Sequence, residues 1–335
     1  IILTFYIILK DQNIGEMFQI LGTVKLQYIL IAVLCMCIYV LGESINIGRT
    51  LKALNEKTTF FQNIKYALIG FFFSGITPAA SGGQPMQIYY MYKDKISVAN
   101  STLSLLINLS SMQVVTISLA LISVVVNHSI MNTALICFFV IGILLNASAL
   151  TLLIIAIFHK KLLQKLINFV VKIMKKIKIK NVDKKQEKIE NELNKYQASS
   201  DYIKEHKLVM LKTIFTTYIQ FLAYYSVSYW VYRSFGLNEY NILKIISIQS
   251  GTVSGIPSPG AVGVTEGGFI EIFKTVFPKN SINGAMILNR GINFYLLIVI
   301  SAVITMTNAI KFQKMEEKNT ENNEEISWKK QKNNI

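Results

Sequence analysis

The chain has 335 residues and a formal net charge of +15, with 52% hydrophobic and 16% charged residue types. Roughly a quarter of the residues of an ordinary soluble domain are charged, so this composition argues against a complete soluble catalytic domain. The charges are also clustered. The uncharged runs between the clusters are Leu26–Gly42, Tyr66–Tyr92, Ile96–Phe158, Thr213–Tyr232, Ile245–Thr265 and Gly291–Ile310. Because a helix crosses the bilayer core with about 20 apolar residues, the runs predict an all-α polytopic membrane helix bundle.

The first apolar pieces of the chain set the order of the predicted helices. Ile1–Leu9 is too short to span a membrane, and we expect it to end a first helix. A signal peptide is the alternative, but no basic region precedes this piece. The uncharged run Ile96–Phe158 covers 63 positions, which is enough for two crossings. We expect the turn between them near Asn127–Asn132.

A basic segment, residues 159–207, separates two membrane halves, 1–158 and 208–310. It has 14 Lys against 6 acidic residues, a net charge of +8. Positive loops stay on the cytoplasmic side, so we expect this linker and the charged tail 311–335 to be cytoplasmic. Apolar residues recur every three or four positions in Lys160–Lys180, with lysines between them. This pattern is typical of a helix that lies on an anionic membrane surface; a solvated linker is the alternative.

Each half contains a run that proline and glycine interrupt. In the first half the break is Ile76–Pro85, and basic residues flank the run 66–92 on both sides. In the second half it is Pro257–Gly263, within 240–278. Broken helices at membrane depth mark substrate sites of transporters, since bare backbone is tolerated there only when protein or a water-filled cavity covers it. We therefore expect two re-entrant or broken segments that enter from opposite faces, an arrangement compatible with an inverted repeat.

The residues at these breaks resemble a known family. Thr77-Pro-Ala-Ala-Ser-Gly-Gly-Gln-Pro-Met-Gln87 and Pro257-Ser-Pro-Gly-Ala-Val-Gly-Val-Thr-Glu266 are similar to the transmembrane domain of the lysylphosphatidylglycerol synthase, or flippase-like, family. Gly48-Arg49 and Arg290 also match its pattern, and the resemblance covers about residues 1–315. It implies a bacterial cell membrane, multi-pass location.

The resemblance implies a lipid-handling function. Full-length family members carry a cytoplasmic domain that transfers an amino acid from tRNA to phosphatidylglycerol. Their membrane part is implied to move the aminoacylated lipid outward, which protects against cationic peptides. The tail 311–335 is too polar to bury a core, so we expect this chain to lack the transferase domain. The prediction is a protein that binds or translocates an anionic or aminoacylated phospholipid. The alternative is a phosphatidylglycerol lysyltransferase that acts only with a separate synthase domain.

The candidate lipid-binding residues cluster at the breaks and at three charged positions. They are Arg49, Ser81, Gly82, Gly83, Gln84, Pro85, Gln87, Pro257, Pro259, Gly260, Gly263, Glu266 and Arg290. The glycines could admit a headgroup or only allow close packing, and the glutamines could bind a headgroup or cap a helix. Glu266 could receive an ammonium group or pair with Arg290, which could otherwise hold a phosphate.

We expect no cofactor, no metal and no catalytic residue in this chain. The three cysteines lie inside apolar runs and the three histidines are scattered, so neither type has metal-ligand spacing. The lysines of the linker have no aromatic interleaving, so nucleic acid is not an expected partner. The expected partners are the membrane and phosphatidylglycerol or its aminoacyl form. A separate synthase and a homo-oligomer remain open.

Overall fold

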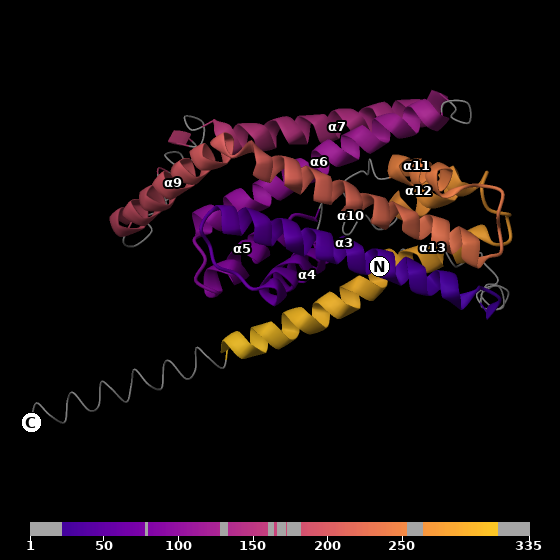
Figure 1. Ribbon diagram of the computed structural model, residues 1–335, viewed down its shortest axis with the longest axis horizontal. Coiled ribbons are helices and arrows are strands. Elements are labelled where there is room, and N and C mark those ends of the chain that lie inside the picture. The colour runs from indigo at the N-terminus through magenta and orange to yellow at the C-terminus, as the bar shows by residue number, and fades with distance from the viewer. Residues whose placement is uncertain are drawn as a thin grey trace, which may run out of the picture.

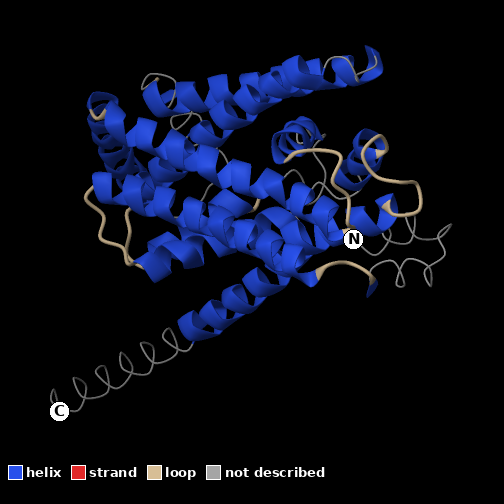
Figure 2. Ribbon diagram, turned by 45° about the vertical axis from the view of Figure 1, so that its right-hand side comes forward, coloured by secondary structure: helices blue, strands red, loops and turns tan. Residues whose placement is uncertain are grey.

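The computed structural model of the chain describes residues 22–77, 80–127, 133–159, 164–165, 172, 182–252 and 264–313, with the backbone alone for 133–139, 182–188, 251–252 and 264. Every regular element in these ranges is a helix, and short loops join several of them (Figure 2). The predicted all-α class is therefore confirmed. The opening piece 1–9, most of Lys160–Lys180 and the tail from Lys314 lie outside the described residues.

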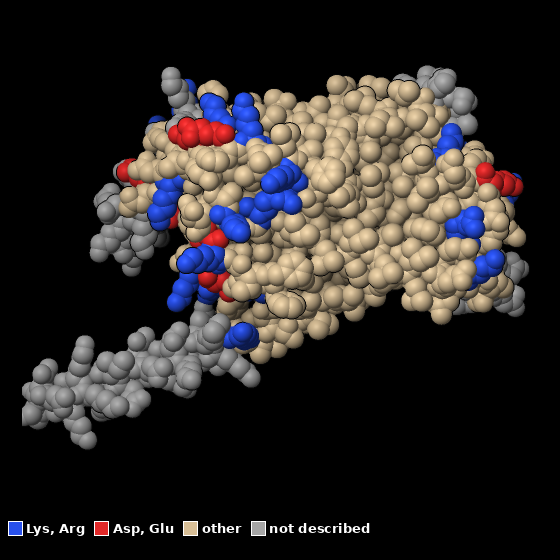
Figure 3. All heavy atoms as spheres, viewed as in Figure 1, with Lys and Arg blue, Asp and Glu red and all other residues tan. Residues whose placement is uncertain are grey.

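Four described helical segments are long and apolar enough to cross a membrane. They are Leu26–Ala53 (α3), Val98–Asn127 (α6), Val140–Phe158 within α7 (Thr133–Phe158), and Ile282–Gln313. The last of these contains α13 (Ile282–Arg290) and η4 (Gly291–Tyr295), and we call Ile282–Gln313 the C-terminal helix. Charged side chains gather at the two ends of the molecule, with an uncharged belt between them (Figure 3). This distribution is that of an integral membrane protein.

The helix α10 (Lys207–Ser234) packs along α3 through the middle of the bundle (Figure 1). It is not among the four apolar segments, because it carries many polar residues, and several of these are buried. The buried polar residues are Thr213, Thr217, Gln220, Ser226, Ser228 and Ser234. Gly42 of α3 lets α10 approach closely, since a Cβ there would lie 3.0 Å from the Gln220 Cβ. Asn46 then donates a buried 3.0 Å hydrogen bond to the Thr217 hydroxyl.

Two shorter helices, α4 (Phe60–Ile76) and α5 (Gly83–Lys93), form a hairpin at one end of the bundle (Figure 1). A capping box of Thr59 and Gln62 starts α4. Thr77 ends it, donating to the Phe73 carbonyl at 2.6 Å and accepting from the Gly82 N–H at 2.8 Å. Pro85 fits the first turn of α5, where a missing N–H costs nothing.

A second pair of short helices, α11 (Ile242–Thr252) and α12 (Val264–Phe273), lies at the opposite end (Figure 1). The segment 253–263 between them, with Pro257, Pro259, Gly260 and Gly263, is outside the described residues. An apolar core joins α12 to α10 and α13 through Phe269, Phe273 and Phe277. The bundle thus has one short helix pair at each end of its long helices.

The helix α9 (Val182–Glu205), in the linker, closes the ends of two long helices. Its Glu192 carboxylate accepts hydrogen bonds from the Ala99 N–H at 2.9 Å and the Ser97 hydroxyl at 3.1 Å, where α6 begins. The Tyr196 and Ser200 hydroxyls donate to the carbonyls of Ala156 and Ile157, in the last turn of α7. These contacts satisfy backbone groups that have no partner inside their own helix.

The close contact of α4 and α5 gives a test of packing. An added Cβ at Gly83 would collide with the Ser74 hydroxyl and lie 2.9 Å from the Gly70 carbonyl oxygen. We expect G83A to lower the free energy of unfolding by about 1–3 kcal/mol. The control is G267A, because a Cβ there meets nothing within 4 Å. Thermal unfolding of the detergent-purified proteins measures both, and equal stability of the two variants would contradict the close contact.

The Glu192 cap gives a test of pH dependence. Partial burial raises the pKa of this carboxyl, but the hydrogen bonds from Ala99, Lys195 and Ser97 outweigh that effect and lower the pKa below its ordinary value. A lowered pKa in the folded state adds stability above the ordinary value of 4.5, and this stability is lost as the pH falls through the folded pKa. We therefore expect E192Q to be less stable than the parent at neutral pH, with the difference shrinking below pH 4.5. Thermal melts across pH check this, and a difference that does not depend on pH would contradict it.

Candidate functional site: a buried ionic and aromatic cluster

The centre of the candidate site is an ion pair between α12 and α13. Glu266 lies in the first turn of α12, and Arg290 is the last residue of α13. The Arg290 Nε donates to the Glu266 Oε1 at 2.9 Å, and the two residues are 3% and 2% exposed. Charges removed from water this completely are stable only when they are paired and hydrogen-bonded. The structure thus brings together the two charged residues that the sequence predicted for the second half.

Two aromatic rings from η4 contact this ion pair. The Arg290 guanidinium carbon lies 4.2 Å from the centroid of the Phe294 ring, a cation–π distance. The Tyr295 hydroxyl donates to the Glu266 Oε1 at 3.4 Å. The π-helical turn that carries both rings begins directly after Arg290. Such turns are rare and often occur at functional sites.

Polar side chains from three helices surround the ion pair's neighbour, Asn289. The Ser228 hydroxyl of α10 lies 3.1 Å from the Asn289 Oδ1 and 2.8 Å from the Gln249 Oε1 of α11. All three residues are buried. The Asn293 Oδ1, one turn further on, is buried and has no hydrogen-bond partner in the described part of the chain. The interior is therefore polar where α10, α11 and α13 meet.

Phe294 also links this cluster to the first helix pair. The Phe71 ring of α4 lies 6.1 Å from the Phe294 ring, centroid to centroid. A Cβ on Gly75, near the end of α4, would meet Phe294 and Ile298. Arg290 contacts the same Phe294 ring, so this one side chain touches both α4 and the ion pair. The helix that leads into the first break, α4, therefore approaches the C-terminal helix inside the bundle, next to the arginine that pairs with α12.

The motif residues of the first break take part mainly in packing. Gly83 is buried against Gly70 and Ser74 of α4, and Gly82 is half-buried against Thr77. The Gln87 side chain is buried and donates to the Tyr66 carbonyl at 3.1 Å, which ties α5 to α4. These contacts agree with the close-packing interpretation of the glycines.

Other residues of this break face outward. Ser81 and Pro85 are exposed, and Gln84 is half-buried. Ala80 has φ of 55°, in the left-handed region that non-glycine residues rarely adopt. The turn of the first break is thus strained, and its polar residues lie at its surface.

Arg49 lies in a different place from Arg290. Its guanidinium donates to the Asn46 Oδ1 at 2.8 Å, the Lys212 carbonyl at 2.9 Å and the Thr216 hydroxyl at 2.8 Å. These contacts hold the end of α3 to the beginning of α10. Arg49 therefore joins two helices near the lysine-rich end of the bundle, and it is not part of the ionic cluster.

The structure adds Glu43 of α3, which the sequence analysis missed. It lies in the middle of a membrane-spanning helix, 17 positions after Leu26 and 10 before Ala53. Its carboxylate accepts a 3.2 Å hydrogen bond from the Gln220 side chain, and this is its only hydrogen-bond partner in the described part of the chain. The signal was present in the sequence, because an ionisable residue inside a span is a functional candidate by default.

Aromatic residues connect Glu43 with the ion pair. Tyr39, one turn before Glu43, lies within electrostatic reach of its carboxylate. The Tyr39 ring lies 5.2 Å from the Tyr224 ring of α10. Tyr224 in turn lies within electrostatic reach of both Glu266 and Arg290. A line of polar and aromatic side chains thus crosses the interior from α3 through α10 to α12 and α13.

Among the residues that the structure describes, no group of three His, Cys, Asp or Glu is placed to hold a metal ion. Cys35 and Cys37 are free thiols on α3. The site therefore offers charges of both signs, aromatic faces and amide groups. Such groups bind charged and hydrogen-bonding molecules by electrostatics and shape.

Comparison with known families gives one match. The model of the family described as "Lysylphosphatidylglycerol synthase TM region" matches residues 1–301. A search of curated proteins found no match. The family match covers most of the 335 residues and includes both breaks, Glu43, Glu266 and Arg290. The chain therefore belongs to the lysylphosphatidylglycerol synthase transmembrane-region family.

Proposed function

We propose that this chain binds an anionic or aminoacylated phospholipid and moves its headgroup between the two leaflets of a bacterial plasma membrane. The observation that carries the proposal is the line of polar groups that leads from the half-buried Glu43, Tyr39 and Tyr224 to the buried Glu266–Arg290 pair. Charged groups at membrane depth are costly and usually have a function. A headgroup that crosses the bilayer needs partners of this kind.

The proposal assigns different parts of the headgroup to different charges. Arg290 would bind the phosphate, because a guanidinium offers several donors in a planar fork. Glu43 would receive the ammonium of an aminoacyl group, since Gln220 is its only hydrogen-bond partner in the described ranges. Glu266 is engaged by Arg290 and would hold that guanidinium in place when no phosphate is bound.

The two helix pairs fit this function as hairpins that enter the bilayer from opposite faces. Each pair lies at one end of the bundle (Figure 1). The α4–α5 pair shares its end with α9, where many lysines lie, and the positive-inside rule would make that end cytoplasmic. Movement of α4 against Phe294 would expose the cluster to one side or the other. The acyl chains would remain in the surrounding lipid.

The ion pair gives the first test of this function. In liposomes that contain fluorescent phosphatidylglycerol or its lysyl form, a membrane-impermeant quencher reports transfer between leaflets. We expect E266Q/R290Q to reduce transfer at least tenfold, because the phosphate loses its partner. The double variant is used because removing one partner leaves a buried unpaired charge, which costs about 3–5 kcal/mol.

Two further variants separate binding from structure. E271Q is the matched control, because Glu271 is an exposed carboxylate on the same helix, α12. We expect it to transfer lipid at the parent rate. The swap E266R/R290E restores the ion pair with its charges exchanged. If the swap folds and restores full transfer, the pair has only a structural role and the assignment of Arg290 to the phosphate is wrong.

Glu43 gives a test of headgroup selectivity. E43Q retains a hydrogen-bonding side chain of the same shape but loses the negative charge. We expect it to slow transfer of the lysyl lipid about tenfold more than transfer of unmodified phosphatidylglycerol, since only the former carries the ammonium group. The same liposome assay gives the ratio of the two rates. An equal reduction for both lipids would show that Glu43 does not bind the ammonium.

A further inference from the structure

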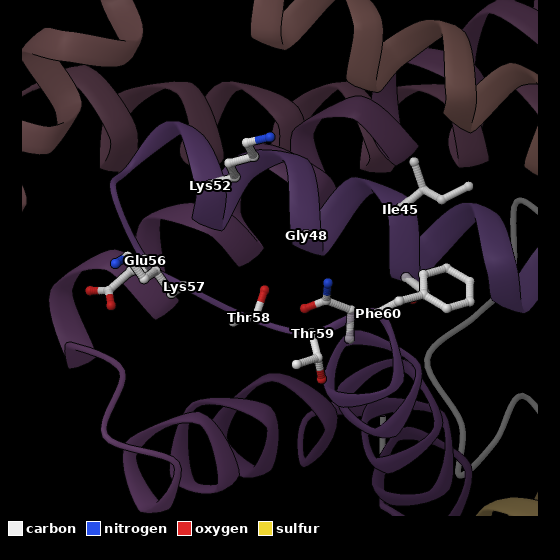
Figure 4. Close-up of a pocket in the computed structure, with 10 residues that line it drawn as sticks. Ile45, Gly48, Lys52, Glu56, Lys57, Thr58, Thr59 and Phe60 are labelled. Carbon is white, nitrogen blue, oxygen red and sulfur yellow. The ribbon is translucent and has the colours of Figure 1, made fainter.

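A cavity of about 550 Å³ lies between α3 and the start of α4 (Figure 4). None of the residues that line it belongs to the ionic cluster. Its lining comes from one face of α3, from the loop that follows it, and from the first turn of α4. The lining residues are Ser44, Ile45, Gly48, Lys52, Glu56, Lys57, Thr58, Thr59, Phe60 and Asn63. This volume suits a phospholipid headgroup, since small-molecule sites are about 300–1,000 Å³.

The charge around this pocket is positive. Lys52 lies on α3 at one side of the opening and Lys57 lies on the loop (Figure 4). Both side chains are exposed, and neither ammonium group has an ion pair or a hydrogen bond within the described ranges. The one acid of the lining, Glu56, already accepts from the Asn100 side chain at 2.7 Å and the Ser97 N–H at 3.3 Å. The two ammonium groups are therefore free to bind an anion.

The inner wall of the pocket contains polar atoms without partners. The Ser44 hydroxyl and the Asn63 Oδ1 are buried and have no hydrogen-bond partner in the described part of the chain. The two residues are 0% and 6% exposed. A buried polar group without a partner costs about 1–3 kcal/mol. Both atoms are closed off from solvent and lie behind the surface that a ligand would meet.

An exposed apolar stripe on α3 leads away from the pocket. It begins at Ile45, which lines the pocket, and continues towards the start of the helix at steps of three or four residues. The members of the stripe are Leu26, Leu30, Leu34, Ile38, Leu41 and Ile45. Residues at this spacing share one helix face. Phe60, which lines the pocket, and its neighbour Phe61 are also exposed apolar side chains.

We propose that this pocket binds the headgroup of an anionic phospholipid at the lysine-rich end of the bundle. The phosphate lies between Lys52 and Lys57, and the acyl chains lie along the α3 stripe. The stripe favours a membrane lipid over a free phosphate ion. The class of ligand rests on the proposed function, but binding here does not require transfer between leaflets.

Titration of the detergent-purified chain, followed by native mass spectrometry, tests this site. The probes are dioleoyl-phosphatidylglycerol and dioleoyl-phosphatidylcholine, which have the same acyl chains, and inorganic phosphate as a competitor. We expect preferential binding of phosphatidylglycerol, and a loss of roughly 30-fold in K52Q/K57Q, because each lysine contributes about 1 kcal/mol near an anionic lipid. A photoactivatable phosphatidylglycerol should also crosslink within residues 44–63.

The matched control is K204Q/K207Q, which removes two exposed lysines near the same end but outside the pocket lining. We expect it to bind as the parent does. Equal losses in both double variants would mean unspecific attraction to the lysines and would overturn the site. Full competition by inorganic phosphate would overturn a lipid ligand. Loss of binding in K52Q/K57Q with unchanged leaflet transfer would support the pocket and leave the proposed function intact.

Discussion

The buried ion pair of Glu266 and Arg290 is the interaction on which the arrangement of the interior depends. It joins α12 to α13 at 2.9 Å, and the guanidinium also covers Phe294. The same ring contacts α4 through Phe71. In a bilayer there is no water to solvate a charge that loses its partner. Arg290 therefore couples the positions of α12, the π-helical turn and the first helix pair.

The long helices depend on a second constraint: the backbone N–H and carbonyl groups at their ends need hydrogen-bond partners. Glu192, Tyr196 and Ser200 of α9 bond to the first N–H groups of α6 and the last carbonyls of α7. Arg49 bonds α3 to a carbonyl of α10 at the same end of the bundle. A segment that the sequence presents as a basic linker thus includes a helix that stabilises the bundle. These hydrogen bonds satisfy the polar groups at the helix ends. The middle of each long helix can therefore be apolar on its lipid-facing side and polar on its inner side.

Features encoded locally were predictable from the sequence, and features that depend on distant pairing were not. Hydropathy predicted the two helices α6 and α7, and proline with glycine predicted the break between α4 and α5. The turn predicted near Asn127–Asn132 falls on residues 128–132, which are outside the described residues. The bond of Glu43 to Gln220 joins positions 177 apart, so no local pattern could indicate it. The π-helical turn at Gly291–Tyr295 arises from packing against its neighbours, which the sequence does not reveal. Likewise, no local pattern indicates that Arg49 contacts Thr216 of α10, 167 positions away.

The difference between the two interior carboxylates bears on how a headgroup could be held. Glu266 has a cation at hydrogen-bond distance, whereas Glu43 has a neutral amide. An aminoacylated phospholipid carries both a phosphate and an ammonium, so a site with one arginine and one carboxylate without a cationic partner matches it in sign. Under the proposed function, the phosphate shares Arg290 with Glu266 and the ammonium binds Glu43, so each charge of the headgroup meets an opposite charge. The rings of Tyr39 and Tyr224 lie between Glu43 and the Glu266–Arg290 pair. Their flat apolar faces would separate the phosphate of a bound headgroup from its ammonium group.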